Sequence, residues 1–147
     1  MIDFKSNYMR LSRMIRIIII CILLCGTAQA EDKNKWTTTD TALQVTYTVL
    51  HVMDWSQTLH IARNPTTNAE KGAIPRHIIG PHPSEGRVNS FLAVGLIAHT
   101  AISIALPKKV EILGMNIPAR NLWQLVWIGI EQDAVRHNIR TGIKISF

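Results

Sequence analysis

The stretch RVNSFLAVGLIAHTAISIAL, residues 87–106, is the most apolar part of the chain after residue 30 and decides its fold class. Apolar and small residues dominate it, and His99 is its only ionisable side chain beyond Arg87. A run of this length and composition is typical of a helix that could cross a membrane. Pro107 ends the run, and Ser84 can cap its start through its hydroxyl oxygen. We predict a helix over residues 85–106.

The stretch TALQVTYTVLHVMDWSQTLHIAR, residues 41–63, predicts a second long helix. Its first residues alternate between apolar and polar as a strand would, but the length of the run favours a helix over residues 39–63. Thr39 or Asp40 is a suitable cap, and Asn64-Pro65 ends the helix. A third helix is expected over residues 119–139, after the charged link PKKVEILGMNIPAR.

The N-terminus has the pattern of an export signal. Basic residues precede the short apolar run from Ile17 to Leu24, and Ala28-Gln29-Ala30 matches a cleavage site for a signal peptide over residues 1–30. The alternative is an uncleaved N-terminal anchor. Cleavage would leave residues 31–147 as a single helical domain without Cys21 and Cys25, so that thiol chemistry and cysteine-ligated metal would be excluded.

The two remaining segments are a connector and a tail. Residues 64–86 form a long connector rich in Pro, Gly, Asn and Thr, and a connector of that length is often functional or mobile. It carries His77 and His82, of which His82 is a candidate binding residue. The last residues, 143–147, alternate between apolar and polar and predict a short extended tail.

The charge of the chain gives little support to nucleic-acid binding. The net charge is +6, but Lys5, Arg10, Arg13 and Arg16 belong to the export signal. The other basic residues are spread through loops and helix ends, and no basic helix face is interleaved with aromatic residues. We therefore expect no nucleic-acid partner.

The three helices are compatible with a bundle in the inner membrane or with a soluble bundle in the periplasm. If residue 31 lies outside, the loops expected inside carry seven Lys and Arg residues and those outside carry five, in the direction of the positive-inside rule. Charged residues in the first and third helices oppose insertion, since each costs about 2.5–3.5 kcal/mol at the bilayer centre. We favour the inner membrane over the periplasm.

Each predicted helix carries polar residues on one face near its middle or in its later half. These are Asp54 with Gln57, His99 with Ser103, and Gln124 with Glu131 and Asn138 at intervals of seven. If the faces converge, Asp54, His99 and Glu131 meet inside the bundle. Such a cluster could hold a divalent metal, act as an acid–base pair, or fix the packing of the helices by hydrogen bonds. The last alternative is the plainest, and no specific metal-ligand motif is present.

Several segments together resemble a group of small uncharacterised exported helical proteins of proteobacteria and their phages. They are DWSQT (54–58), GPHPSEGRVNSF (80–91), HTAISIALP (99–107) and WQLVWIGIEQDAVRHN (123–138). The resemblance implies a location in the cell envelope and a phage or prophage origin. It implies no catalytic residue and no cofactor.

We therefore expect an all-α protein: a three-helix bundle after a signal peptide, with a long loop between the first two helices. The expected function is that of a small envelope protein acting through protein or lipid contacts, without an identifiable reaction. One alternative is a small metal-dependent or acid–base enzyme, such as a hydrolase, with Asp54, His99 and Glu131 as catalytic or metal-binding candidates. Another is a soluble periplasmic binding module. Gln57, Ser103, Gln124, Asn138 and His82 are the binding candidates.

Overall fold

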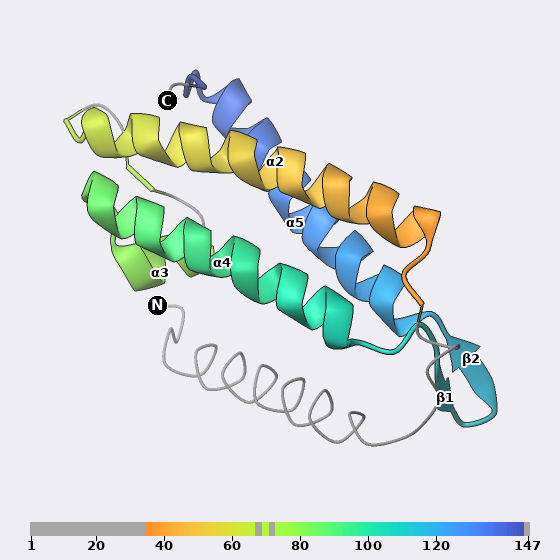
Figure 1. Ribbon diagram of the computed structural model, residues 1–147. Helices are drawn as coiled ribbons and strands as arrows, with labels where there is room; N and C mark the ends of the chain where they lie inside the picture. Colours follow the sequence, from red (N-terminus) through yellow and green to blue (C-terminus); the bar gives the residue numbers. More distant parts are fainter. Residues whose placement is uncertain (1–34, 67–68, 71–72, 146–147) are drawn as a thin grey trace, which may run out of the picture.

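Three long helices lie side by side in the computed structural model, which describes residues 35–66, 69–70 and 73–145 (Figure 1). They are α2 (Thr38–Arg63), α4 (Glu85–Ala105) and α5 (Ala119–Arg140). α2 and α5 run in the same direction, and α4 runs in the opposite one (Figure 1). The prediction of a predominantly helical chain is confirmed. The predicted signal peptide, residues 1–30, lies outside the described residues.

The helix ends follow from local hydrogen bonds. Thr37, and not Thr39 or Asp40 as predicted, is the N-cap of α2, because its hydroxyl accepts a hydrogen bond from the Asp40 backbone N–H at 3.2 Å. Asp40 completes a capping box by accepting the Thr37 backbone N–H at 2.8 Å. Ser84 caps α4 as predicted, and that helix ends at Ala105, two residues before Pro107.

The two links between the long helices contain structure that the sequence patterns did not predict. The long connector forms the short helix α3 (Ala73–Ile79), which packs beside α4. The charged link forms a hairpin of β1 (Val110–Ile112) and β2 (Met115–Ile117), paired antiparallel. Its two turn residues, Leu113 and Gly114, both have positive φ, at 51° and 77°, as the tight turns that match strand twist require. Residues 143–145 of the predicted extended tail form no strand.

α2 is the element that holds the others together. It contacts both α4 and α5, whereas α4 and α5 touch each other at few positions. At the α3 end, a small apolar core of Leu59, Ile79, Val88 and Leu92 joins α2, α3 and α4. An ion pair between Arg63 and Glu85, 2.9 Å long and partly exposed, links the end of α2 to the start of α4.

At the hairpin end, the buried side chain of Arg120 joins all three long helices. From α5 it donates two hydrogen bonds, of 3.1 and 2.8 Å, to the Leu106 carbonyl at the end of α4. Its third nitrogen, Nη1, lies 3.3 Å from Oδ2 of Asp40 in α2. Burial alone would raise the pKa of the Asp40 carboxyl, but the hydrogen bonds from Thr37 and the Arg120 charge outweigh it and lower the pKa.

Replacing Arg120 with Met should therefore destabilise the fold by about 3–5 kcal/mol, because the Asp40 carboxylate would be left buried without its cation. The free energy of unfolding in denaturant measures this loss. Lys109→Met is the control: Lys109 is exposed between α4 and β1, and its change should stay within about 0.5 kcal/mol. The double variant Arg120→Met with Asp40→Asn should lose less than the sum of the single changes. Strict additivity would contradict the assignment.

Candidate functional site

A cavity of about 690 Å³ lies between α4 and α5, with α2 as its back wall. α2 contributes Tyr47, His51 and Asp54, and the connector and α3 contribute Glu70 and Pro75 at one end. The remaining lining residues lie on α4 and α5. They are Phe91, Leu92, Gly95, Ala98, His99, Ile102, Trp123, Trp127, Ile130, Glu131, Asp133, Ala134, His137 and Asn138. The cavity exists because α4 and α5 are each packed against α2 and only sparsely against each other.

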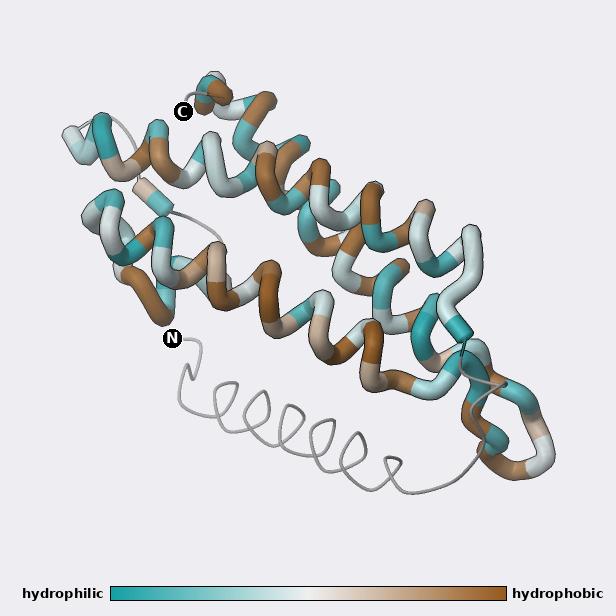
Figure 2. Tube along the Cα trace, viewed as in Figure 1, coloured by the Kyte–Doolittle hydropathy of each residue, from teal (hydrophilic) through white to brown (hydrophobic). Residues whose placement is uncertain are grey.

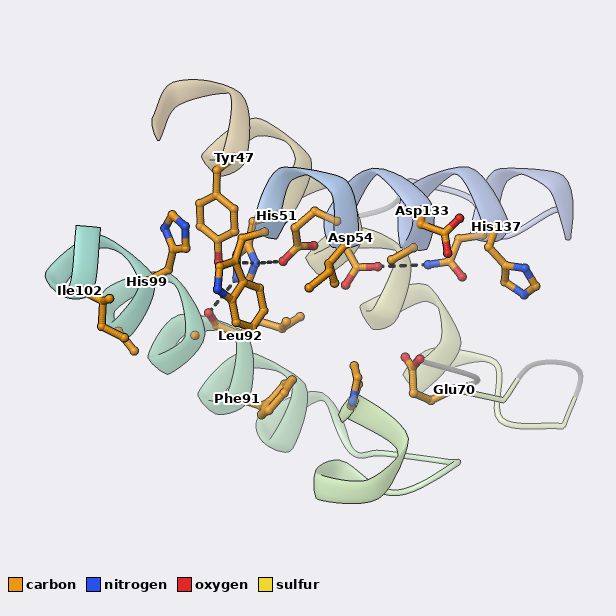
Figure 3. A pocket seen from close by; sticks show the side chains of 18 of the residues that line it. Tyr47, His51, Asp54, Glu70, Phe91, Leu92, His99, Ile102, Asp133 and His137 are labelled. Carbon is orange, nitrogen blue, oxygen red and sulfur yellow. Dashed lines mark hydrogen bonds and ion pairs between the residues drawn. The ribbon is translucent and has the colours of Figure 1, made fainter. Parts of the chain in front are cut away.

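His51 stands at the middle of this cavity and connects all three long helices (Figure 3). Its Nδ1 lies 2.7 Å from Oε1 of Glu131 in α5, and its Nε2 lies 2.9 Å from the carbonyl oxygen of Leu92 in α4. The Tyr47 hydroxyl, one turn earlier in α2, lies 3.3 Å from the same Nδ1. His51 and Glu131 are 3% and 7% exposed, so that water does not weaken their interaction.

The partners of His51 fix where its protons are. The Leu92 carbonyl only accepts hydrogen bonds, so Nε2 carries a proton. Nδ1 faces a carboxylate oxygen at hydrogen-bond distance, and a second proton lies between these two atoms. The pair is therefore compensated in charge inside the protein. Neither ring nitrogen is left open toward the cavity to remove a proton from a substrate.

The end of the cavity nearest α3 is acidic. Asp54 is 7% exposed, and its Oδ1 accepts a hydrogen bond from Asn138 Nδ2 at 3.2 Å. Figure 3 shows Glu70, Asp133 and His137 at this same end. Among the described residues, no lysine or arginine lines the cavity. The described cavity lining therefore carries more carboxylates than cationic side chains at this end.

The opposite end of the cavity is aromatic. The rings of His99 and Tyr47 are stacked with their centroids 3.5 Å apart, and Trp123 stacks near His99 at 5.7 Å. Trp127 meets the His99 ring edge-on at 6.2 Å. His99 is 3% exposed, yet among the described residues neither of its ring nitrogens has a hydrogen-bond partner. A buried imidazole without partners is costly, and such groups mark functional sites or unfilled ligand positions.

The structure places the three central candidates, Asp54, His99 and Glu131, on the wall of one cavity. It does not bring them into contact as a triad: Glu131 bonds to His51, Asp54 bonds to Asn138, and His99 stacks on Tyr47. Within the described residues, no group of three or more His, Cys, Asp or Glu is arranged to hold a metal ion. A catalytic or metal-binding role of the three remains a hypothesis.

The other candidates are dispersed. Asn138 lines the cavity beside Asp54. Gln124 lies at the hairpin end, where its amide donates to the Asp40 carbonyl at 3.1 Å. Gln57 and Ser103 are buried outside the cavity lining, and the Ser103 hydroxyl donates to the carbonyl of His99 in its own helix. His82 is exposed between α3 and α4 and does not line the cavity.

His51 is the central residue that the sequence patterns did not select. The other histidine of the same helix, His60, lies nine residues later and does not share its helix face, so the two form no ligand-pair pattern. The informative spacing was shorter: Tyr47, His51 and Asp54 follow one another at intervals of four and three residues, and such residues share one helix face.

The His51–Glu131 pair generates a prediction about stability. Glu131→Ala should cost about 3–5 kcal/mol, because His51 would remain buried without its partner. Glu131→Gln should cost about 1 kcal/mol, because the His51 ring then stays neutral: its Nε2–H still donates to the Leu92 carbonyl, and its Nδ1 accepts a hydrogen bond from the Gln amide. Unfolding in denaturant measures both changes. Glu85→Ala breaks the partly exposed pair with Arg63 and is the control, at about 0–1 kcal/mol. Equal losses for the Ala and Gln variants of Glu131 would contradict this picture.

Comparisons with protein-family models, with curated proteins and with solved structures found no match to this chain.

Proposed function

We propose that this chain is a small helical protein of the cell envelope that resides in the inner membrane. There it acts by binding envelope components, protein or lipid, without catalysing a reaction. The observation that carries the proposal is the distribution of polar and apolar side chains, which is the inverse of that in a water-soluble bundle. The resemblance to small exported proteins of proteobacteria and their phages supports the same location.

Polar side chains outnumber hydrophobic ones in the interior, and many large apolar side chains lie on the outside. Among the described residues, twelve buried side chains are polar or charged and eight are hydrophobic, whereas sixteen large hydrophobic side chains are exposed. A soluble protein of this size exposes single apolar residues but keeps its apolar side chains mainly inside. A helical bundle in lipid does not need to keep its apolar side chains inside, and its polar residues face the interior and hydrogen-bond to one another.

The apolar exterior forms a belt around the three long helices. Figure 2 shows hydrophobic residues along the length of α4, the one described helix that is long and apolar enough to cross a membrane. No exposed Asp, Glu, Lys or Arg occurs between residues 88 and 105, which corresponds to about 27 Å of helix. The same holds for residues 41–62 of α2 and for residues 121–132 of α5. The belt on α5 is shorter, because Asp133 and Arg136 are exposed.

The charged groups inside this belt are paired in the way that a membrane interior requires. An isolated charge at the bilayer centre costs about 2.5–3.5 kcal/mol on insertion scales. Glu131 meets His51 at 2.7 Å, and Asp54 accepts a hydrogen bond from Asn138. The exposed charges lie beyond the belt, with Lys109 at the hairpin end and Arg63, Arg87 and Arg140 at the other.

An acid–base enzyme receives less support from the same geometry. A general base needs a free lone pair within reach of a substrate proton, but both nitrogens of His51 already face acceptors within the protein. Its carboxylate partner is engaged at the same time. We therefore assign this pair to the architecture of the bundle.

Cysteine labelling tests the membrane location. In the full chain with Cys21 and Cys25 changed to Ser, one new cysteine replaces Ile97, on the outer face of α4, or Leu113, at the tip of the hairpin. Both positions are open in the protein alone, with 69% and 92% of the side chain exposed. In isolated membranes, a water-soluble maleimide should label Leu113→Cys and leave Ile97→Cys unlabelled until the membrane is dissolved and the protein denatured. Alkaline carbonate should leave both variants in the membrane pellet.

A protein that is not in the membrane would give the opposite labelling result. A soluble bundle would be released by carbonate, and its Ile97→Cys variant would react about as fast as Leu113→Cys. That outcome would favour the soluble periplasmic binding module.

A third variant, Lys144→Cys, tests the orientation, because Lys144 lies at the opposite end of the bundle from the hairpin. In spheroplasts, the reagent should reach Leu113→Cys and should not reach Lys144→Cys until the inner membrane is opened.

A further inference from the structure

The cavity between α4 and α5 has two chemically different ends, and this difference indicates the chemistry of the molecule that would fit it. Figure 3 shows Asp54, Glu70, Asp133 and His137 at one end, and Tyr47, His99 and Ile102 at the other. Along α5 its lining runs from Trp123 to Asn138, a distance of about 22 Å. A volume of about 690 Å³ is within the range of cavities that hold small organic ligands.

The cavity opens to the outside between the two helices. Ala98, Ile130 and Asp133 line it and are also exposed, so they form its rim. Ile130 and Ala98 belong to the apolar belt, whereas Asp133 lies where the belt of α5 ends. A molecule that enters here would place an apolar chain at belt level and a polar head near the charged end of the bundle.

The charge of the acidic end selects the head group. Four carboxylates line the cavity, from Asp54, Glu70, Glu131 and Asp133, and among the described residues no lysine or arginine does. Of these, Glu131 is compensated by His51, while the hydrogen bond that Asp54 accepts comes from the neutral Asn138. An anionic head would be repelled here, and a cationic ammonium group would be attracted.

A second and independent observation points to an occupant. His99 lines the cavity and is only 3% exposed. Among the described residues, neither of its ring nitrogens has a hydrogen-bond partner. Trp123 also lines the cavity, and its buried indole N–H likewise lacks a partner within the described chain. Buried polar atoms of this kind are normally hydrogen-bonded in native proteins. Because these nitrogens are themselves fully buried, a bound molecule would supply the missing partner only when the rings turn toward the cavity.

We propose that this cavity binds an amphiphile with a cationic ammonium head, held at the carboxylates of Asp54 and Asp133, and an apolar chain that extends past His99 and Trp127. The inference rests on the proposed function in one respect: if the protein lies in the membrane, the opening of the cavity faces the lipid, and the apolar chain of the ligand can enter directly from there. Binding itself needs no membrane. It is therefore measured on purified full-length protein in mild detergent, separately from the labelling experiment.

The probe is a dodecylammonium ion with bromine on its chain, which quenches indole fluorescence on contact. Trp123 and Trp127 line the cavity, whereas Trp36 and Trp55 do not, so the measurement uses the Trp36→Phe, Trp55→Phe protein. We expect half-maximal quenching at a concentration at least tenfold lower than for the brominated dodecyl alcohol and dodecyl sulfate. Equal potency of the three amphiphiles would overturn the assignment of the head group.

Two pairs of variants locate the ends of the ligand. Asp54→Asn keeps the size of the side chain and should raise the half-maximal concentration of the ammonium probe about tenfold, with no effect on the alcohol. Its control is Glu111→Gln, an exposed hairpin residue outside the cavity, which should change neither. Ala98→Phe should block quenching by filling the opening. Its control, Ala101→Phe, alters an exposed alanine of the same helix that does not line the cavity.

A negative result with either Asp54→Asn or Ala98→Phe would overturn the proposed binding mode. Unchanged affinity in Asp54→Asn shows that the acidic end does not hold the head, and unimpaired quenching in Ala98→Phe shows that the probe binds elsewhere. Circular dichroism of each variant establishes that it is folded. If Ala98→Phe does not fold, the comparison of ammonium with alcohol in Asp133→Asn replaces it, with the same tenfold shift expected.

Discussion

The two hydrogen bonds of the His51 ring are the interaction on which the arrangement of the helices depends. One side chain of α2 holds a backbone carbonyl of α4 and a carboxylate of α5, with both contacts shorter than 3 Å. A ring has fixed distances between its nitrogens, so it sets the separation of the two helices as well as their alignment along α2. Arg120 repeats this design at the hairpin end, from α5 toward Leu106 and Asp40.

Such polar bridges specify a structure better than they stabilise it. Removing charges from water costs several kcal/mol per ion, and a good ion pair recovers only part of that cost. The apolar core cluster of Leu59, Ile79, Val88 and Leu92 lies at the α3 end and includes no residue of α5, so it does not by itself align α5 with the other helices. The buried bridges fix that alignment, because any shift would leave Arg120 or Glu131 buried without a partner.

The sequence predicted the helices well because their signals are local. Prolines, caps and a long apolar run placed the ends of α4 to within one residue of the predicted boundaries. The hairpin was missed because its turn uses Leu113 at a position with φ of 51°, where Asn or Gly is the usual signal. The partners of the site residues were not predictable from helix faces alone. His51 and Glu131 are separated by 80 residues, and only the packing of α2 on α5 shows that Glu131 meets His51 while His99 meets Tyr47.

The cavity is a consequence of the same bridges. A third helix would normally close against its neighbours, but α4 and α5 are both attached to α2 and hardly to each other. The residues that line the gap include the small Gly95 and Ala98 on α4 and the large aromatic Trp123 and Trp127 on α5. Closing the gap would require His51 to give up the Leu92 carbonyl or the Glu131 carboxylate. The pair that secures the fold therefore also keeps open the space in which a ligand can bind.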